Sequence, residues 1–125
     1  MILEAGVICL ALNIHYEAGV DPIEGQLAVA LVTLNRAKHN SANLCNAVFR
    51  PGQFEWTAKI PPGPSRKQME QYRSTAVVAL SLHDFTNGAD HFCHYKSYCS
   101  WAASMQFKGR WGSHNFYKAP RKGKR

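Results

Sequence analysis

Long apolar runs and acidic residues are both scarce in this sequence of 125 residues. The longest apolar run, from Ala5 to Leu12, holds about eight residues, whereas a helix that crosses a membrane needs roughly 20. Glu4 precedes this run, and Asn13 and His15 follow it, where a secretory signal would carry positive charge and then a small-residue cleavage site. We therefore expect no membrane-spanning helix and no signal peptide, and a chain that is made in the cytoplasm.

The shortage of acidic residues leaves the chain strongly basic. Eight Asp and Glu residues stand against 15 Lys and Arg residues, so the formal net charge is +7. A charge excess of this kind favours an anionic partner such as nucleic acid, a lipid headgroup layer or an acidic polymer. Residues 1–64 are slightly acidic, and the second half carries all of the excess. The last eight residues contain five basic residues and no acidic one: Lys118, Arg121, Lys122, Lys124 and Arg125.

Length and composition indicate one globular domain. A domain usually has roughly 100–200 residues, and a chain of this size buries about two-thirds of its unfolded surface. With 46% hydrophobic and 18% charged residues, and without internal repeats, the sequence excludes a disordered or collagen-like protein. We assign residues 1–118 to this domain and residues 119–125 to a basic tail that binds an anionic surface. A solubilising or artificially added end would have the same composition.

Two helices are predicted in the N-terminal part. The second has a strong start signal, because Asp21 can cap it, Pro22 suits its first position and Glu24 can complete a capping box. This helix is expected to run to about Lys38. The first is expected over residues 2–18, where apolar residues recur at helical spacing: Val7, Leu10, Ile14 and Ala18.

A long loop separates these helices from a third. Residues 39–64 contain many Pro and Gly residues and are expected to form a loop with a short helical turn over residues 44–49. Ser65 and Gln68 form another capping box, which opens a helix that runs to about His83. Its predicted core-facing residues are Met69, Tyr72, Ala76 and Leu80.

The C-terminal half shows shorter elements. We expect strands over residues 89–95 and 114–117, and a short helix over residues 101–107. Together these elements predict an α+β fold that is mainly α, with one domain and a small β element in the C-terminal half.

Four cysteines could form two disulfides. Cys9 lies in the middle of a predicted helix among apolar residues, and we interpret it as a small core hydrophobe. Cys93 and Cys99 are close enough in sequence to pair in an oxidising compartment. Several further residues have zinc-ligand chemistry but form neither a CxxC pair nor an HExxH motif, so we expect no metal and no cofactor. These residues are His91, Cys93, His94, Cys99 and His114.

Glu17 is the carboxylate whose position is hardest to explain structurally. It lies in the last turn of the first predicted helix, where the helix dipole disfavours a negative charge. Apolar and aromatic neighbours should raise its pKa further, and a partly protonated acid near neutral pH is what general-acid cleavage of a glycosidic bond needs. We therefore consider Glu17 a candidate catalytic acid, with a solvated helix-end glutamate as the alternative.

Two other carboxylates lie near candidate functional segments. Glu24 is explained by its capping box, and the break between the first two helices prevents helical spacing from placing it beside Glu17. Glu55 lies in the long loop between Phe54 and Trp56. Aromatic rings beside polar groups suit a sugar-binding groove, because rings cover the apolar faces of sugars while polar groups orient them. A simple packing cluster would have the same residues.

Six short blocks follow one another along roughly residues 10–118. They are Glu17-Ala18, then EGQLAVA from Glu24, LNR from Leu34, PGQFEWT from Pro51, GADHF from Gly88 and GSHNFY from Gly112. In this order the blocks resemble the SleB/CwlJ-type cell-wall hydrolases, whose patterns are YxEARGE, EGQxAVA, LNR, PGQFSWT, GATHYH and GNHxFY. Six blocks in the right order are more specific than any single motif.

The resemblance implies a lysozyme-like fold and cleavage of the β-1,4 bond between N-acetylmuramic acid and N-acetylglucosamine in peptidoglycan. It also implies that Glu17, which matches the first Glu of the family pattern, is the catalytic acid. Two positions depart from the pattern, because Arg-Gly-Glu is replaced by residues 19–21 and the second His of GATHYH by Cys93. The small size resembles the phage lysins of this group, so we expect an endolysin that acts on the cell wall or in the periplasm.

Two products can follow protonation of the leaving oxygen by Glu17. With Glu24 as a second carboxylate, water completes a hydrolysis; with Glu17 alone, the muramic acid 6-hydroxyl attacks and leaves a 1,6-anhydro end. We favour the second reaction, that of a lytic transglycosylase, because capping already explains Glu24. The candidate substrate-binding residues are Tyr16, Gln26, Gln53, Phe54, Trp56, His91 and His114.

Two other classes of protein are alternatives. A zinc-dependent amidase or peptidase would use His91, Cys93 and His114. A basic nucleic-acid-binding domain would account for the charge, but the aromatic residues of the loop lie in the near-neutral first half, away from the basic tail. We therefore expect peptidoglycan glycan strands and an anionic envelope as partners, no nucleic acid, and a monomer.

Overall fold

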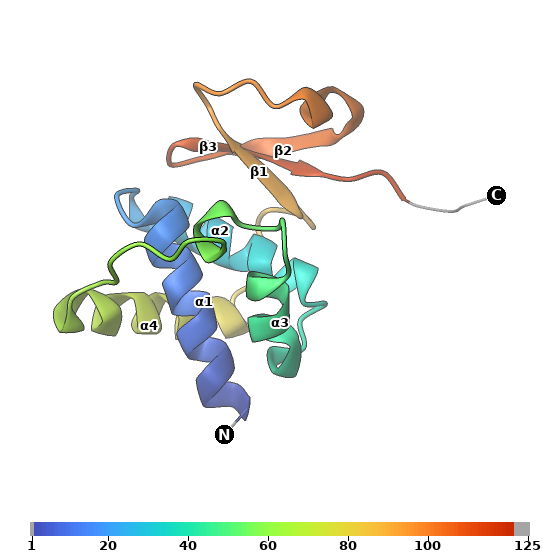
Figure 1. The fold of residues 1–125 in the computed structure, drawn as a ribbon. Helices are drawn as coiled ribbons and strands as arrows, with labels where there is room; N and C mark the ends of the chain where they lie inside the picture. Colours follow the sequence, from blue (N-terminus) through green and yellow to red (C-terminus); the bar gives the residue numbers. More distant parts are fainter. Residues whose placement is uncertain (1, 122–125) are drawn as a thin grey trace.

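The computed structural model describes residues 2–121, which form a helical layer with a small antiparallel sheet on one side of it (Figure 1). This mainly helical α+β architecture confirms the predicted fold class. The elements, in chain order, are α1 (Ile2–Ala18), α2 (Ile23–Arg36), η1 (Ser41–Asn43), α3 (Leu44–Phe49), η2 (Glu55–Thr57), α4 (Arg66–Ser81), β1 (His91–His94), η3 (Ser100–Ser104), β2 (Gln106–Trp111) and β3 (His114–Lys118).

Helix α1 is the centre of the hydrophobic core. It packs against α2, α3 and α4, and all four residues of the predicted apolar stripe are buried. Burial of each large aliphatic side chain contributes about 1.5–3 kcal/mol. Gly6 allows the close approach of η1, because a Cβ there would lie 2.7 Å from the carbonyl oxygen of Ser41. The C-terminal end of α1, which carries Glu17, lies toward the sheet (Figure 1).

Helix α2 begins and ends close to the predicted positions, but its capping differs. Pro22 is the N-cap and no side chain caps the helix, so the predicted cap by Asp21 and the capping box with Glu24 are wrong. The reason is tertiary: the Asp21 carboxylate accepts a hydrogen bond of 2.8 Å from the hydroxyl of Ser113 instead. This bond ties the turn between α1 and α2 to the turn between β2 and β3. Glu24 is left exposed to solvent.

The predictions for α3 and α4 are confirmed. The hydroxyl of Ser65 accepts from the backbone N–H of Gln68 at 3.1 Å, and the Gln68 side chain accepts from the backbone N–H of Ser65 at 2.9 Å. Helix α4 packs on α1 with Tyr72 and Ala76 buried, and the predicted Met69 and Leu80 lie against the same core. The long loop between α3 and α4 therefore starts and ends at fixed helices.

The sheet has the strand order β1-β3-β2, with both pairs antiparallel. The two predicted strands are present, but β2 was missed, because a short helix was predicted over residues 101–107. The structure has the 3₁₀ helix η3 there and then a strand whose register shifts between Phe107 and Gly109. This irregularity breaks the alternation by which a strand is recognised. Phe116 of the central strand is fully buried beside α2.

Two disulfides link residues within the layers. Cys9 of α1 bonds Cys45 of α3, and Cys93 of β1 bonds Cys99. The interpretation of Cys9 as an unpaired core residue is therefore wrong: α1 and α3 approach until the two Cα atoms are 5.2 Å apart, which is within bonding geometry. The pairing of Cys93 with Cys99 is as the sequence allowed.

Within residues 2–121, no helix is both long and apolar enough to cross a membrane. Of the predicted basic tail, residues 122–125 lie outside the described residues. Its first residue is tied to the domain, because the backbone N–H of Ala119 donates to the Asp90 carboxylate at 2.9 Å.

Candidate active site

Glu17 lines a cavity of about 630 Å³ between the helical layer and the sheet. It lies half-buried in the last turn of α1, at the edge where the two layers meet. The helical layer contributes Glu17, Arg36, Gly52, Gln53 and Glu55 to this cavity. The sheet and its connections contribute His91, Phe92, Cys93, His94, Ser97, Cys99, Trp101, Met105 and His114.

The environment of Glu17 favours its protonated form. Burial raises the pKa of Glu17 to about 7, the positive charge of Arg36 opposes this rise, and the negative charge of Glu55 adds to it. A carboxyl group with a pKa near 7 is available both as a proton donor and, after donation, as a base at neutral pH. The raised pKa of Glu17 agrees with the predicted direction, and its largest cause is burial.

Arg36 lines the cavity beside Glu17 and was not among the predicted site residues. Its Nε donates to the carbonyl oxygen of Asp90 at 2.7 Å, and its Nη1 donates to Oε1 of Gln53 at 3.2 Å. The guanidinium group also lies 4.7 Å from the ring centre of Phe54. These contacts hold a positive charge at the base of the cavity and join the sheet to the long loop. The signal for Arg36 was present in the Leu34-to-Arg36 block.

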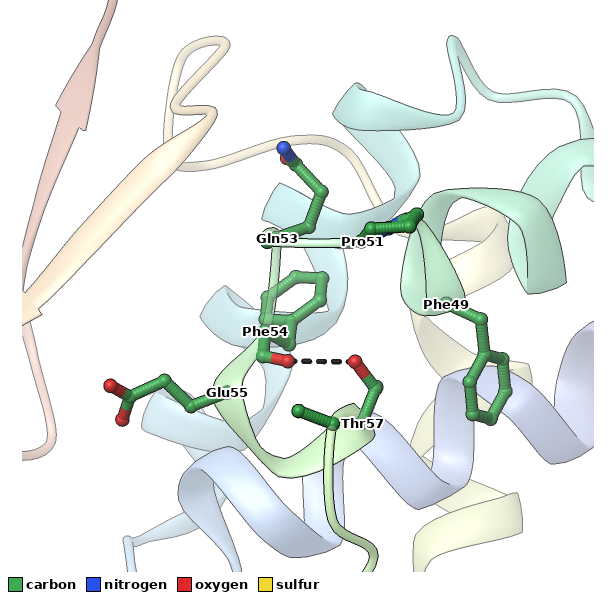
Figure 2. A pocket seen from close by; sticks show the side chains of 8 residues that line it. Phe49, Pro51, Gln53, Phe54, Glu55 and Thr57 are labelled. Atoms are coloured by element: carbon green, nitrogen blue, oxygen red, sulfur yellow. Dashed lines mark hydrogen bonds between the residues drawn. The ribbon is translucent and has the colours of Figure 1, made fainter.

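The long loop forms one wall of the site. Figure 2 shows the Gln53 and Glu55 side chains extending from this loop, with Glu55 on the side opposite Phe49. Gln53 and Glu55 line both the cavity of Glu17 and a neighbouring cavity of about 600 Å³, so the two cavities share a border. Phe54 is buried beneath this wall and contributes its ring to both a smaller cavity with Glu17 and the neighbouring cavity.

Tyr16 and Trp56 support this wall from behind. Their rings are stacked with centres 4.3 Å apart, and Trp56 is buried. The hydroxyl of Tyr16 donates to the carbonyl oxygen of Pro61 at 2.9 Å, and Nε1 of Trp56 donates to Oδ1 of Asn13 at 2.8 Å. Neither of the two is among the residues that line the cavity of Glu17. Their polar groups are engaged within the protein, so they position the loop.

The sheet supplies the opposite wall. His91 and His114 both line the cavity, as predicted, and Nδ1 of His91 is 2.8 Å from the Asp90 carboxylate. Nδ1 of His114 is 3.4 Å from Oδ2 of Asp21. Burial lowers the pKa of His114, with the Asp21 charge opposing and His94 adding to this effect, so the ring is neutral at pH 7.

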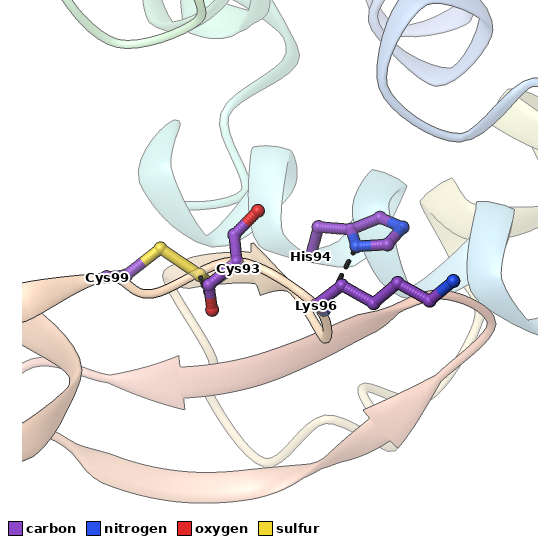
Figure 3. The surroundings of a disulfide bond; sticks show 5 residues. Cys93, His94, Lys96 and Cys99 are labelled. Carbon is purple, nitrogen blue, oxygen red and sulfur yellow. Dashed lines mark hydrogen bonds between the residues drawn. A yellow bond between two sulfur atoms is a disulfide. The ribbon is translucent and has the colours of Figure 1, made fainter.

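A disulfide shapes the rim of this wall. Figure 3 shows the Cys93–Cys99 bond beside His94, whose Nδ1 accepts a hydrogen bond of 3.1 Å from the backbone N–H of Lys96. The bond closes the loop that leads to Trp101, whose ring is 5.3 Å from that of His91. The loop and its aromatic ring are thereby held over the cavity.

Two further predicted site residues, Glu24 and Gln26, do not line the cavity of Glu17. Glu24 is exposed on the first turn of α2 and is not among the residues of the cavity. The side chain of Gln26 donates to the carbonyl oxygen of Asp21 at 3.2 Å and lines a different cavity, between α2 and α4. In the EGQ block, Gln26 therefore stabilises the turn before α2 and does not reach the cavity of Glu17.

The ligand set of the zinc alternative is not available. Sγ of Cys93 is bonded to Cys99, so the trio of His91, Cys93 and His114 has no thiolate. Within the described residues, no three His, Cys, Asp or Glu side chains are grouped as a metal site would require.

The helical layer with its small sheet is a lysozyme-like fold. Two solved structures share this fold: the catalytic domain of Bacillus cereus SleB and that of the germination-specific lytic transglycosylase SleB from Bacillus anthracis. The TM-scores are 0.73 and 0.74 at 24% identity; the matches cover 92% and 90% of this chain, and 91% and 93% of the SleB chains. No curated protein matches the chain.

The family model described as Cell Wall Hydrolase matches residues 20–117. The chain therefore belongs to the cell wall hydrolase family, and it is an enzyme of peptidoglycan degradation. The matched residues begin after Glu17. Glu17 is a candidate acid because of its position in the cleft and because of the resemblance described above.

Proposed function

We propose that this enzyme cleaves the β-1,4 bond between N-acetylmuramic acid and N-acetylglucosamine, with Glu17 as the general acid. The single observation that carries the proposal is the half-buried Glu17 with a pKa near 7 in a cleft lined by aromatic rings and polar groups. The fold that the chain shares with a lytic transglycosylase supports the same type of bond.

Catalysis would begin with transfer of the Glu17 proton to the glycosidic oxygen, which leaves as a hydroxyl group. The sugar then carries positive charge at C1. Its own N-acetyl group, or the side chains of Gln53 and His91 on the two walls, can stabilise this charge. The positive charge of Arg36 limits the rise of the Glu17 pKa, so this pKa stays at about 7.

The next step has two forms. The ionised Glu17 can act as a base on the muramic acid 6-hydroxyl, which attacks C1 and gives a 1,6-anhydro end. Water can attack C1 instead, which requires a carboxylate that reaches the water. Glu24 does not fill this role, because it lies outside the cavity. The product therefore depends on whether another carboxylate faces the cleaved bond.

We further propose that the protein acts as an endolysin outside the cytoplasm, on the wall itself. The two disulfides support this location, because disulfides persist in oxidising compartments such as the periplasm. The resemblance to phage lysins and the basic C-terminal end support attraction to an anionic envelope.

Digestion of purified peptidoglycan by the wild type and by Glu17→Gln tests the proposal. The wild type should release fragments cut at the muramic acid bond, and folded Glu17→Gln should release none. Glu70→Gln, on the exposed face of α4, is the matched control and should retain full activity. Retained lysis by Glu17→Gln would overturn the assignment, and release of free peptides or loss of activity with a chelator would favour an amidase instead.

A further inference from the structure

Glu55 is the second carboxylate of the cleft. All eight acidic residues of the chain lie in its described part, and of these Glu17 and Glu55 are the two that line the main cavity. The two come from different elements, because Glu17 ends α1 and Glu55 begins η2. Both also line the smaller cavity of about 160 Å³ with Arg36 and Gln53. They therefore face a common space from two sides.

No structural role accounts for the Glu55 carboxylate. Within residues 4–121 it has no hydrogen-bond or ion-pair partner, and Glu55 is exposed to solvent. Glu4 pairs with Arg73 and Asp84 accepts hydrogen bonds from a turn, whereas Glu24 and Glu70, the other acidic residues without such a partner on the described surface, lie outside the cavity. In Figure 2 the Glu55 carboxylate extends away from its loop, and no drawn residue contacts it. It is free to accept a hydrogen bond from water or substrate.

The backbone of Glu55 is nevertheless held firmly. Its neighbours on both sides are buried, Phe54 beneath the cleft and Trp56 against α1. Trp56 is fixed by its hydrogen bond to Asn13, one turn before Glu17 on the same helix. A free carboxylate on a fixed backbone, facing the catalytic acid, has the properties of a positioned general base.

We propose that Glu55 binds and activates the water that attacks C1 of the muramic acid residue. The enzyme then hydrolyses the bond and leaves a reducing end in place of a 1,6-anhydro end. This inference rests on the proposed function of Glu17. In the step, the oxygen of water forms a bond to C1 while the bond from C1 to the leaving oxygen breaks. Glu55 accepts one proton from the water, and Glu17 gives its proton to the leaving oxygen. The products are a reducing muramic acid end and a free glucosamine hydroxyl.

The family pattern quoted above has serine where this chain has Glu55. A serine hydroxyl cannot take a proton from water as a carboxylate can, so Glu55→Ser should remove the general base and leave Glu17 with the anhydro route.

Digestion of purified peptidoglycan in ¹⁸O-water, followed by mass spectrometry of the fragments, tests the inference. The wild type should give reducing muramic acid ends that carry ¹⁸O. Glu55→Gln and Glu55→Ser should lower the ratio of these ends to 1,6-anhydro ends by about a hundredfold, the usual scale of general-base catalysis. Glu70→Gln should leave the ratio unchanged.

A second readout distinguishes chemistry from structure. Because the Glu55 charge helps to raise the pKa of Glu17, Glu55→Gln should move the alkaline limit of activity to lower pH. Only anhydro ends from the wild type, or an unchanged product ratio in folded Glu55→Gln, would overturn the role of Glu55 and leave that of Glu17 standing. Absence of any glycosidic cleavage by the wild type would instead overturn the proposed function.

Discussion

The indole N–H of Trp56 donates to the side-chain oxygen of Asn13 at 2.8 Å, and both residues are buried. The amide nitrogen of Asn13 in turn donates to the hydroxyl of Thr33 at 3.0 Å. This chain of bonds connects α1, α2 and the long loop. Since Asn13 precedes Glu17 by one turn and Trp56 follows Glu55, it also fixes the two segments that carry the carboxylates of the cleft.

Asn13→Ala should lower the free energy of unfolding by about 2–4 kcal/mol, because the Trp56 and Thr33 groups lose their partner in a buried environment. Urea denaturation followed by tryptophan fluorescence measures this change. Trp56→Phe removes the buried donor but keeps a ring, and should cost less. Equal and small effects of both variants would show that the network does not stabilise the loop.

Glu17→Gln should be as stable as the wild type at low pH and more stable at high pH. The folded protein binds the Glu17 proton more tightly than the unfolded chain, so the wild type loses stability as pH rises from about 4.5 to about 7. Glutamine has no charge to bury and avoids this loss, which amounts to roughly 1–3 kcal/mol. Thermal melts at about pH 4 and pH 8 measure the difference, and equal shifts at both pH values would contradict the burial of the charge.

Activity should fall as pH rises through about 7, because the general acid must be protonated. Arg36→Gln removes the positive charge that lowers the pKa of Glu17, and should therefore move this fall to higher pH. Arg36→Lys keeps a charge and serves as the control for the lost hydrogen bonds. A profile of kcat/KM against pH, measured on soluble glycan fragments, reports the shift; an unchanged profile in Arg36→Gln would mean that Glu17 is not the titrating group.

The two disulfides should contribute differently. The Cys9–Cys45 bond spans 36 positions and the Cys93–Cys99 bond spans 6, so their removal should cost about 4 and about 2 kcal/mol of stability in the chain-entropy model. Replacement of Cys93 and Cys99 by serine should lower activity more, because it frees the loop that leads to Trp101. Denaturation compares the stability of the two double variants, each of which lacks one disulfide, and turnover compares their activity. A larger loss of activity without Cys9–Cys45 than without Cys93–Cys99 would argue against a role of the loop in the cleft.

Truncation after Pro120 should weaken binding to cell walls while leaving turnover of soluble glycan fragments unchanged. It removes four basic residues, Arg121, Lys122, Lys124 and Arg125, and keeps the contact of Ala119 with Asp90. Since salt screens such attraction, the difference should be largest at low ionic strength. Sedimentation of the protein with purified walls over a range of salt concentrations measures it, and salt-independent binding by both forms would exclude an electrostatic tail.

Sequence patterns predicted those parts of the fold that local physics determines. The stripe of α1 and the capping box of Ser65 and Gln68 depend on residues within a few positions of one another, and both were predicted correctly. Asp21 has the local signature of a cap, but it bonds Ser113, which lies 92 positions away. No local pattern contains that partner. Strand β2 was not predicted, because the register shift between Phe107 and Gly109 breaks the alternation of side chains along the strand.

The candidate site shows the same division. Glu17 was singled out as a candidate from its position at a helix end, which is a local property, and its role as the acid stays a prediction. Glu24 was predicted as the second carboxylate of the hydrolytic alternative, but it lies outside the cavity that Glu17 and Glu55 line. Cys9 was assigned to the core, but its partner Cys45 belongs to another helix. In each of these predictions the residue type was suitable, but the partner was a residue that is distant in sequence and close in the fold.

The central place of β3 in the sheet has a consequence for synthesis. Strands β1 and β2 both pair with β3, which follows them in the chain, so neither strand has its partner until residues 114–118 have been translated. His114, which completes the cleft wall, belongs to the same strand. The helical layer can fold as it emerges, but the cleft is completed only once residues 114–118 have been made and have paired with β1 and β2. A copy that stops before β3 therefore lacks part of the cleft wall and should be inactive.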